Sequence, residues 1–316
     1  MALMHFEFRE KLMKLKLLIA MLFCFAANLP GDAAAALRVF ACEPEWAALT
    51  EEIGGDLVKV SVATNALQDP HYLEARPSLI AKVRRADLVV CTGAQLEIGW
   101  LPMLLGKANN PKVRPGSPGY FEAGSFVRHL EVPAAIDRSQ GDVHPQGNPH
   151  IQTDPRNIAL VAQALGERMA SLDVDSAGHY QSRLEQFMSG WNAAIVKWEA
   201  EATPLRGKRV VTHHKSWVYL ENWLGLELLG TLEPLPGIPP TASHLSKLLA
   251  QLGDDGSGAD FIIRTPYQSS KPSEWLSQRT SIPELMLPFT VGGDDEAGDL
   301  YSLFSDTIER LLEVSE

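Results

Sequence analysis

Residues 176–203 limit the possible folds more than any other segment, because they form one proline-free amphipathic stretch in the middle of the chain. At 1.5 Å per residue, a single helix of about 28 residues would be about 42 Å long. Gly190 is the one weak helix former near its centre. A helix of this length predicts a stiff connection between two bodies rather than a flexible linker.

The segments on both sides of this stretch alternate between short apolar runs and amphipathic runs. Strands are predicted over 37–42, 58–64, 86–93, 125–131, 208–214, 259–265 and 284–293. Helices are predicted over 44–55, 76–86, 215–226, 242–252 and 299–315, with a further helix starting at Pro155, where proline occupies the first helical position. Such alternation is typical of a parallel sheet covered by helices. The predicted fold is therefore α/β, with two βα lobes (residues 37–175 and 204–316) that have mostly parallel sheets and are joined by one long rigid linker helix (176–203).

The N-terminus has the three parts of a secretory signal peptide. A basic stretch at 13–16 precedes an apolar run at 17–27, and small residues at 33–36 suggest cleavage near Ala36. The apolar run is shorter than the ~20 residues of a transmembrane helix. Cys24 lies inside it without small residues before it, so no lipoprotein anchor is expected. Residues 1–36 are therefore predicted to be a signal peptide, which in a two-membrane bacterium directs the protein to the periplasm.

The net charge narrows the classes of molecule that the protein could bind. The chain has a net charge of −11, and removing residues 1–36 takes away four basic and three acidic residues, which leaves −12. This balance argues against a nucleic-acid or anionic-membrane partner and suits a cationic ligand.

Cys42 and Cys91 each lie at the end of an apolar run. They either form a disulfide between neighbouring strand ends or are two buried thiols.

Three distant histidines stand in similar surroundings. His71 follows a predicted strand through a short loop, His150 precedes the helix that starts at Pro155, and His214 lies where a strand ends and a helix begins. Ligands of open parallel sheets bind beyond the carboxyl ends of the strands. Neutral imidazole is a suitable donor for Zn²⁺. His213 should point to the opposite face from His214, and His144 is either an auxiliary capture residue or a solvent-exposed side chain.

The stretches DPHYLEARPS (69–78), NPHIQTDPRN (148–157) and HHKSWVYLENWLGL (213–226) resemble the zinc/manganese-binding solute receptors of ABC importers, the cluster A-I metal receptors. The resemblance covers essentially the whole chain after residue 36. It implies a metal site in a cleft between two lobes, with His71, His150 and His214 as ligands. Histidine instead of glutamate at the third position favours Zn²⁺ over Mn²⁺.

The fourth ligand implied by the resemblance is less well defined. The family often uses a carboxylate after the last strand, but Pro288 and Phe289 stand near that place. Asp294 or Asp295 is therefore expected to substitute, and otherwise a water or another group completes the site.

The function implied is that of a periplasmic, monomeric, non-enzymatic receptor. It would deliver Zn²⁺ to the inner-membrane permease of an ABC importer. A secreted zinc-dependent hydrolase with a three-histidine site is the alternative, although no HExxH motif is present. A receptor for haem or a chelated metal is a third possibility, with tryptophans in its pocket.

Overall fold

The computed structural model describes residues 36–135, 139, 141, 143–253 and 258–315. The predicted signal peptide thus lies almost entirely outside the described residues. Within them, no helix combines the length and the apolar character needed to cross a membrane.

Two four-stranded sheets form the framework, and every strand pair in them is parallel. The first sheet has the order β2-β1-β3-β4 and the second has the order β6-β5-β7-β8. The strands of the first are β1 (Leu37–Ala41), β2 (Val58–Val62), β3 (Leu88–Cys91) and β4 (Tyr120–Glu122). Those of the second are β5 (Arg209–Thr212), β6 (Glu227–Thr231), β7 (Phe261–Arg264) and β8 (Glu284–Met286). The two orders correspond strand for strand, so each lobe repeats the same parallel α/β plan.

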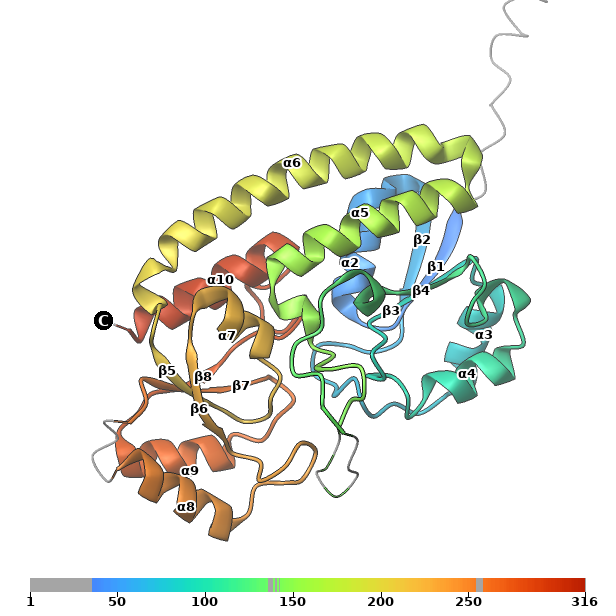
Figure 1. Ribbon diagram of the computed structural model, residues 1–316. Helices are drawn as coiled ribbons and strands as arrows, with labels where there is room; N and C mark the ends of the chain where they lie inside the picture. The colour runs from blue at the N-terminus through green and yellow to red at the C-terminus, as the bar shows by residue number, and fades with distance from the viewer. Residues whose placement is uncertain (1–35, 136–138, 140, 142, 254–257, 316) are drawn as a thin grey trace, which may run out of the picture. The chain divides into compact units, whose positions relative to one another are not determined.

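Helices cover both sheets (Figure 1). In the first lobe they are α2 (Pro44–Gly54), α3 (Pro77–Arg85) and α4 (Leu101–Ala108). In the second lobe they are α7 (Val218–Leu224), α8 (Ala242–Leu252) and α9 (Lys271–Thr280). Because these helices alternate with the strands along the chain, the predicted α/β fold with two parallel-sheet lobes is confirmed.

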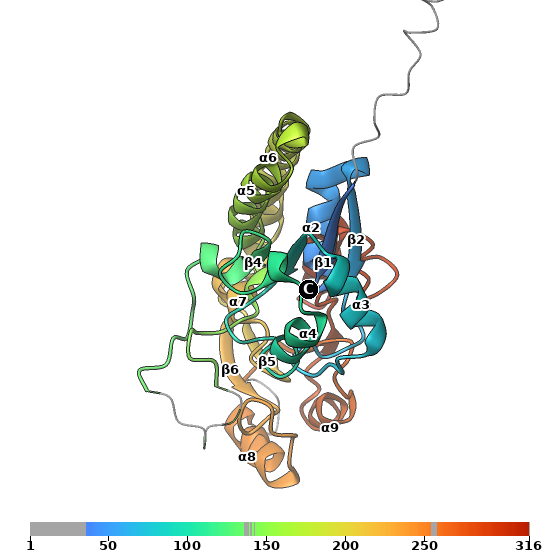
Figure 2. The same cartoon turned by 90° about the vertical axis from the view of Figure 1, so that its right-hand side faces the viewer.

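The long helix predicted from the sequence is α6 (Ala177–Glu201), which runs across both lobes in Figure 1. It lies side by side with α5 (Pro155–Leu172), as both views show (Figure 2), and also contacts α2 and the C-terminal helix α10 (Leu300–Glu313). Trp191 on α6 is fully buried, and its indole N–H donates to the Pro155 carbonyl at 2.8 Å. The linker is thus packed along its length rather than exposed as a free rod.

Two strand predictions are wrong in detail. Residues 125–131 form no strand; β4 lies earlier in the chain, and a 3₁₀ turn (Ala123–Phe126) follows it. The polar groups of this segment make hydrogen bonds that are not part of a sheet. The His129 ring bonds the Gly124 carbonyl, and the Leu130 N–H donates to the Tyr219 hydroxyl. The last strand is only three residues long, with Pro288, which has no N–H to donate, two residues beyond its end. Helices α4 and α9 and strand β6 were not predicted.

Cys42 and Cys91 form a disulfide, with Cα atoms 4.8 Å apart. The pairing follows from the topology, because β1 and β3 are neighbours and both cysteines lie at the same end of the sheet. The structure therefore selects the disulfide over the two buried thiols that the sequence left equally open.

A buried hydrogen bond between the two lobes involves a glutamate. The Thr290 hydroxyl, after β8, donates to a Glu45 carboxylate oxygen on α2 at 2.5 Å. Burial raises the pKa of Glu45 to about 7. Because the folded state then holds a proton that the unfolded state has released, this carboxyl lowers the stability progressively as pH rises from about 4.5 to about 7.

We therefore expect Glu45→Gln to gain stability relative to the unchanged protein as pH rises from 5 to 8, by up to on the order of 3 kcal/mol. Urea denaturation of both proteins at the two pH values measures this difference. Glu74→Gln, an exposed substitution of the same kind, serves as the control. A Glu45→Gln effect that is equal at both pH values would contradict the raised pKa.

Candidate metal centre

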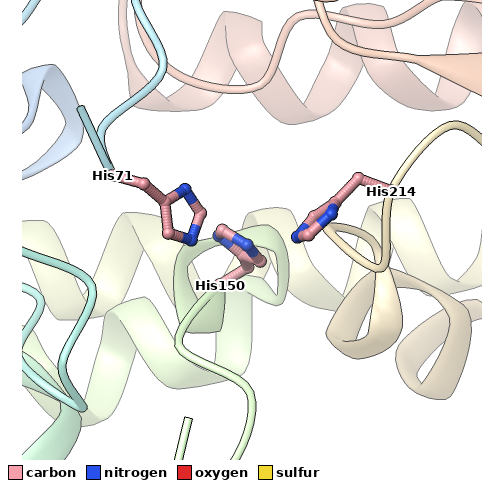
Figure 3. Close-up of side chains that lie close together, drawn as sticks. All are labelled: His71, His150 and His214. Atoms are coloured by element: carbon pink, nitrogen blue, oxygen red, sulfur yellow. The ribbon is translucent and has the colours of Figure 1, made fainter. Parts of the chain in front are cut away.

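His71, His150 and His214, which we call the histidine trio, converge although they are far apart in the sequence. One ring nitrogen from each lies within 4.8 Å of the corresponding nitrogens of the other two. Their ring centroids are 5.3–5.9 Å apart. Figure 3 shows His71 and His214 entering from opposite sides, with His150 between them.

His71 is fixed by the DPH sequence itself. It follows β2 through a short loop in which its backbone N–H donates to the Asp69 carboxylate at 3.0 Å. The same oxygen lies 2.7 Å from His71 Nδ1. The Pro70 carbonyl accepts a hydrogen bond from the buried indole of Trp100. Nε2 of His71 is buried and has no hydrogen-bond partner among the described residues, so it is the nitrogen that remains for a ligand.

His150 forms the floor of the site. Its backbone N–H donates to the Asn148 side chain at 3.0 Å, and the following 3₁₀ turn (Ile151–Thr153) leads into α5. The side chain is 1% exposed, and both ring nitrogens lack a hydrogen-bond partner in the described part of the chain. Burial, together with the surrounding imidazoles, holds the pKa of His150 well below its usual range. The ring is therefore neutral near pH 7, which is the form that binds metals.

His214 comes from the second lobe, two residues after β5. Its Nδ1 lies 2.7 Å from a carboxylate oxygen of Glu233, which also accepts the backbone N–H of Gly237 at 3.0 Å. The neighbouring His213 is also buried, and burial lowers its pKa to about 4. His213 does not belong to the cluster of donor nitrogens among the described residues.

The trio has the features of a preformed cation site. Three imidazoles face one another. The buried nitrogens of His71 and His150 that have no hydrogen-bond partner among the described residues would destabilise the fold unless a ligand bound them. Carboxylates bonded to the Nδ1 atoms of His71 and His214 fix those rings and leave Nε2 for coordination. This donor set fits a borderline-soft divalent cation such as Zn²⁺.

Asp294 lies elsewhere. One of its carboxylate oxygens accepts the backbone N–H groups of Glu296 and Ala297, and the other forms an ion pair with Arg310 on α10 at 2.8 Å. Neither Asp294 nor Asp295 belongs to the described groups of clustered donors. The ring of Phe289 instead faces His150, with centroids 5.4 Å apart. The expected substitution of Asp294 for the fourth ligand is therefore not what this geometry supports.

Two residues that the sequence analysis did not single out support the trio. Asp69 could have been identified from the sequence, because an aspartate two residues before a loop histidine can accept a hydrogen bond from the backbone N–H of that histidine. Glu233 had none, since it comes after β6, a strand that was not predicted, and meets His214 only through the fold. The tryptophans considered for an organic-ligand pocket are buried in the core (Trp46, Trp100, Trp217 and Trp223).

Comparison with known protein families identifies the family of this chain. Residues 39–314 match the family described as "ZnuA: Zinc-uptake complex component A periplasmic". The chain belongs to the ZnuA family. It is thereby a member of the cluster A-I receptors of metal ABC importers, as the three histidine motifs indicated.

Curated relatives of this ZnuA-family chain extend over nearly its whole length. It is 23% identical to the manganese ABC transporter substrate-binding lipoprotein PsaA of Streptococcus pneumoniae, with 94% of each chain covered. It is also 23% identical to the metal ABC transporter substrate-binding lipoprotein SloC of Streptococcus mutans, with 90% of this chain and 91% of SloC covered.

Solved structures show the same fold. A crystal structure of ZnuA superposes with a TM-score of 0.74 at 21% identity, covering 89% of this chain and all of the other. The Mn-bound periplasmic metal-binding protein of Candidatus Liberibacter asiaticus gives a TM-score of 0.71 at 18% identity, covering 88% of this chain and 99% of the other.

Proposed function

We propose that this ZnuA-family protein is a periplasmic zinc receptor that captures Zn²⁺ with His71, His150 and His214 and delivers it to an ABC importer. The observation that carries the proposal is the convergence of three nearly buried imidazoles, whose donor nitrogens lie within 4.8 Å of one another. Zinc is the cargo of this site and must be both bound tightly and released.

Zinc is favoured over manganese by the donor set. The cluster of described donors at this site contains imidazole nitrogens and no carboxylate oxygen. Nitrogen ligands suit Zn²⁺, whereas Mn²⁺ is better served by carboxylate, carbonyl and water oxygens. Among the relatives, PsaA is named for manganese and SloC for metal in general, so this preference rests on the residues of this chain.

Release follows from where the trio is anchored. His71 belongs to the first lobe and His214 to the second, so any displacement of one lobe changes the distance between two ligands. Zinc sites tolerate deviations of only about 0.2 Å from a Zn–N distance of about 2.0–2.1 Å. A displacement of about an ångström on docking to the permease would therefore weaken the site, even though the packed helix α6 restricts large hinge motion.

The proposal includes the placement of the segments along the chain. Residues 1–36 act as the secretion signal, residues 37–175 and 204–316 form the two lobes, and residues 176–203 connect them. The mature protein acts as a monomer in the periplasm, and its partner is the permease of the importer in the inner membrane.

The hydrolase alternative has less support. Three histidines and a water also describe a catalytic zinc site, but hydrolysis needs a general base. In the described part of the chain, Asp69 and Glu233 are the carboxylates bonded to the trio, and each is hydrogen-bonded to a ligand ring. Their role is therefore to orient imidazoles, which a receptor needs as much as an enzyme does.

Elemental analysis of protein purified from its native compartment, followed by competitive titration with Zn²⁺ and Mn²⁺, tests the proposal. We expect one zinc ion per chain and preferential retention of Zn²⁺. Preferential Mn²⁺ binding would contradict the metal assignment. Zinc-dependent hydrolysis of ester or peptide substrates would favour the alternative.

The carboxylates of Asp69 and Glu233, which bond the rings of His71 and His214, should affect the affinity of the trio for zinc. We expect Asp69→Asn and Glu233→Gln each to weaken zinc binding about 10- to 100-fold, because a charged partner on Nδ1 raises the basicity of the coordinating nitrogen. Competition with a chromogenic chelator measures the change. Glu74→Gln, which removes an exposed charge close in sequence to His71, should leave the affinity unchanged. Equal affinities in all four proteins would show that the carboxylates play no such part.

A further inference from the structure

A fourth imidazole lies beside the trio. The ring centroid of His144 is 5.4 Å from that of His71, within the range of 5.3–5.9 Å that separates the trio's own rings. His144 also lines the same cleft as His150 and His214. The donor nitrogens of His144 do not lie within the 4.8 Å cluster, so this ring flanks the trio.

The segment that carries His144 is fixed to the site on its C-terminal side. The His144 carbonyl accepts the Gly147 N–H at 3.0 Å, which closes a tight turn. Gly147 has a φ of +108°, and a Cβ there would lie 2.6 Å from the Leu130 carbonyl oxygen, so this turn requires glycine. Asn148 then bonds the backbone of Leu130 and, through its side chain, the carbonyl of Lys215 in the second lobe. The turn thus returns the chain directly to His150.

Aromatic rings pack beside His150. Phe289 contacts the ring of His150 and packs edge-on against Trp217 and Tyr267, with centroids 5.2 and 6.0 Å away. Zinc in a protein site is almost always four-coordinate. Phe289 offers no donor atom beside His150, whereas the cleft that His144 lines is open to a fourth ligand.

We propose that His144 supplies the fourth nitrogen, so that the cargo ion is held by four imidazoles when the site is loaded. Coordination requires the His144 side chain to move closer to the other three rings than it is in this structure. An all-nitrogen set would strengthen the preference for Zn²⁺ over Mn²⁺. The inference rests on the proposed function, since it adds a ligand to the same zinc site.

Zinc-edge X-ray absorption on the zinc-loaded full chain tests this directly, because multiple scattering reports the number of coordinated imidazoles. We expect four imidazoles in the unchanged protein and three in His144→Ala, together with a loss of zinc affinity of at least about tenfold by chelator competition. His129→Ala is the matched control, because His129 bonds the Gly124 carbonyl and contacts none of the trio's rings in the described contacts. Thermal unfolding of the metal-free variants checks that each is folded.

The possible outcomes distinguish failure of the fourth-ligand proposal from failure of the proposed zinc-receptor function. An unchanged imidazole count in His144→Ala overturns the inference, whatever happens to the affinity. Three imidazoles in the unchanged protein overturn it as well but leave the zinc receptor intact. Failure of the unchanged protein to bind zinc would instead remove the proposed function, and the fourth ligand with it.

Discussion

His150→Ala is expected to abolish tight zinc binding while leaving the fold intact. His150 lies between the other two rings of the trio and supplies one of the three clustered donor nitrogens, so its truncation removes a ligand from the site. The loss should exceed the roughly 10- to 100-fold effect of removing an outer partner of a metal ligand. Chelator competition measures the affinity.

A thermal-shift experiment provides an independent readout of the same variant. A ligand that binds only the folded state stabilises it by about 2.7 kcal/mol at a concentration of 100 times its Kd. Zinc should therefore raise the melting temperature of the unchanged protein and of the control His179→Ala. His179 lies near the start of α6, and its ring bonds the Gly54 carbonyl at the end of α2. A zinc-induced shift that persists in His150→Ala would contradict the site.

Trp191→Ala is expected to produce the largest loss of stability. The indole is fully buried, stacks on Phe187, and meets Tyr301 and Phe304 of α10 with centroids 4.9 and 5.6 Å apart. Truncating a buried tryptophan costs about 3–5 kcal/mol, because it removes apolar contacts and leaves a cavity. The Pro155 carbonyl would also lose its indole donor.

Guanidinium denaturation of the metal-free protein measures this effect. Val196→Ala is the control on the same helix, since Val196 is 68% exposed and its truncation should change the free energy of unfolding by no more than about 0.5 kcal/mol. A Trp191→Ala loss below about 1 kcal/mol would mean that α6 is not held to α5 and α10 through this residue.

The elements predicted correctly are those whose signal is local. The buried strand patterns at 37–42 and 58–64 and the uninterrupted helix pattern at 176–203 each contain their own periodicity, and β1, β2 and α6 follow them closely. Residues 125–131 have an equally strand-like composition, but the Leu130 N–H donates to the hydroxyl of the distant Tyr219 instead of to a neighbouring strand. No local pattern could show that.

The same distinction applies to the site. His71 and His150 stand next to prolines, and His214 follows a strand, so each could be singled out from its neighbours in the sequence. The identity of their partners depends on the fold. Glu233 reaches His214 across 19 positions, while Asp294 is drawn to Arg310 on α10 by an ion pair that the sequence does not reveal.

Anomalous diffraction from crystals of the zinc-loaded protein, recorded on both sides of the zinc absorption edge, tests the zinc site most directly. The predicted result is a single strong peak between the lobes, at about 2.0–2.1 Å from one ring nitrogen each of His71, His150 and His214. A zinc peak elsewhere, or one from which any of these three rings is turned away, would contradict it.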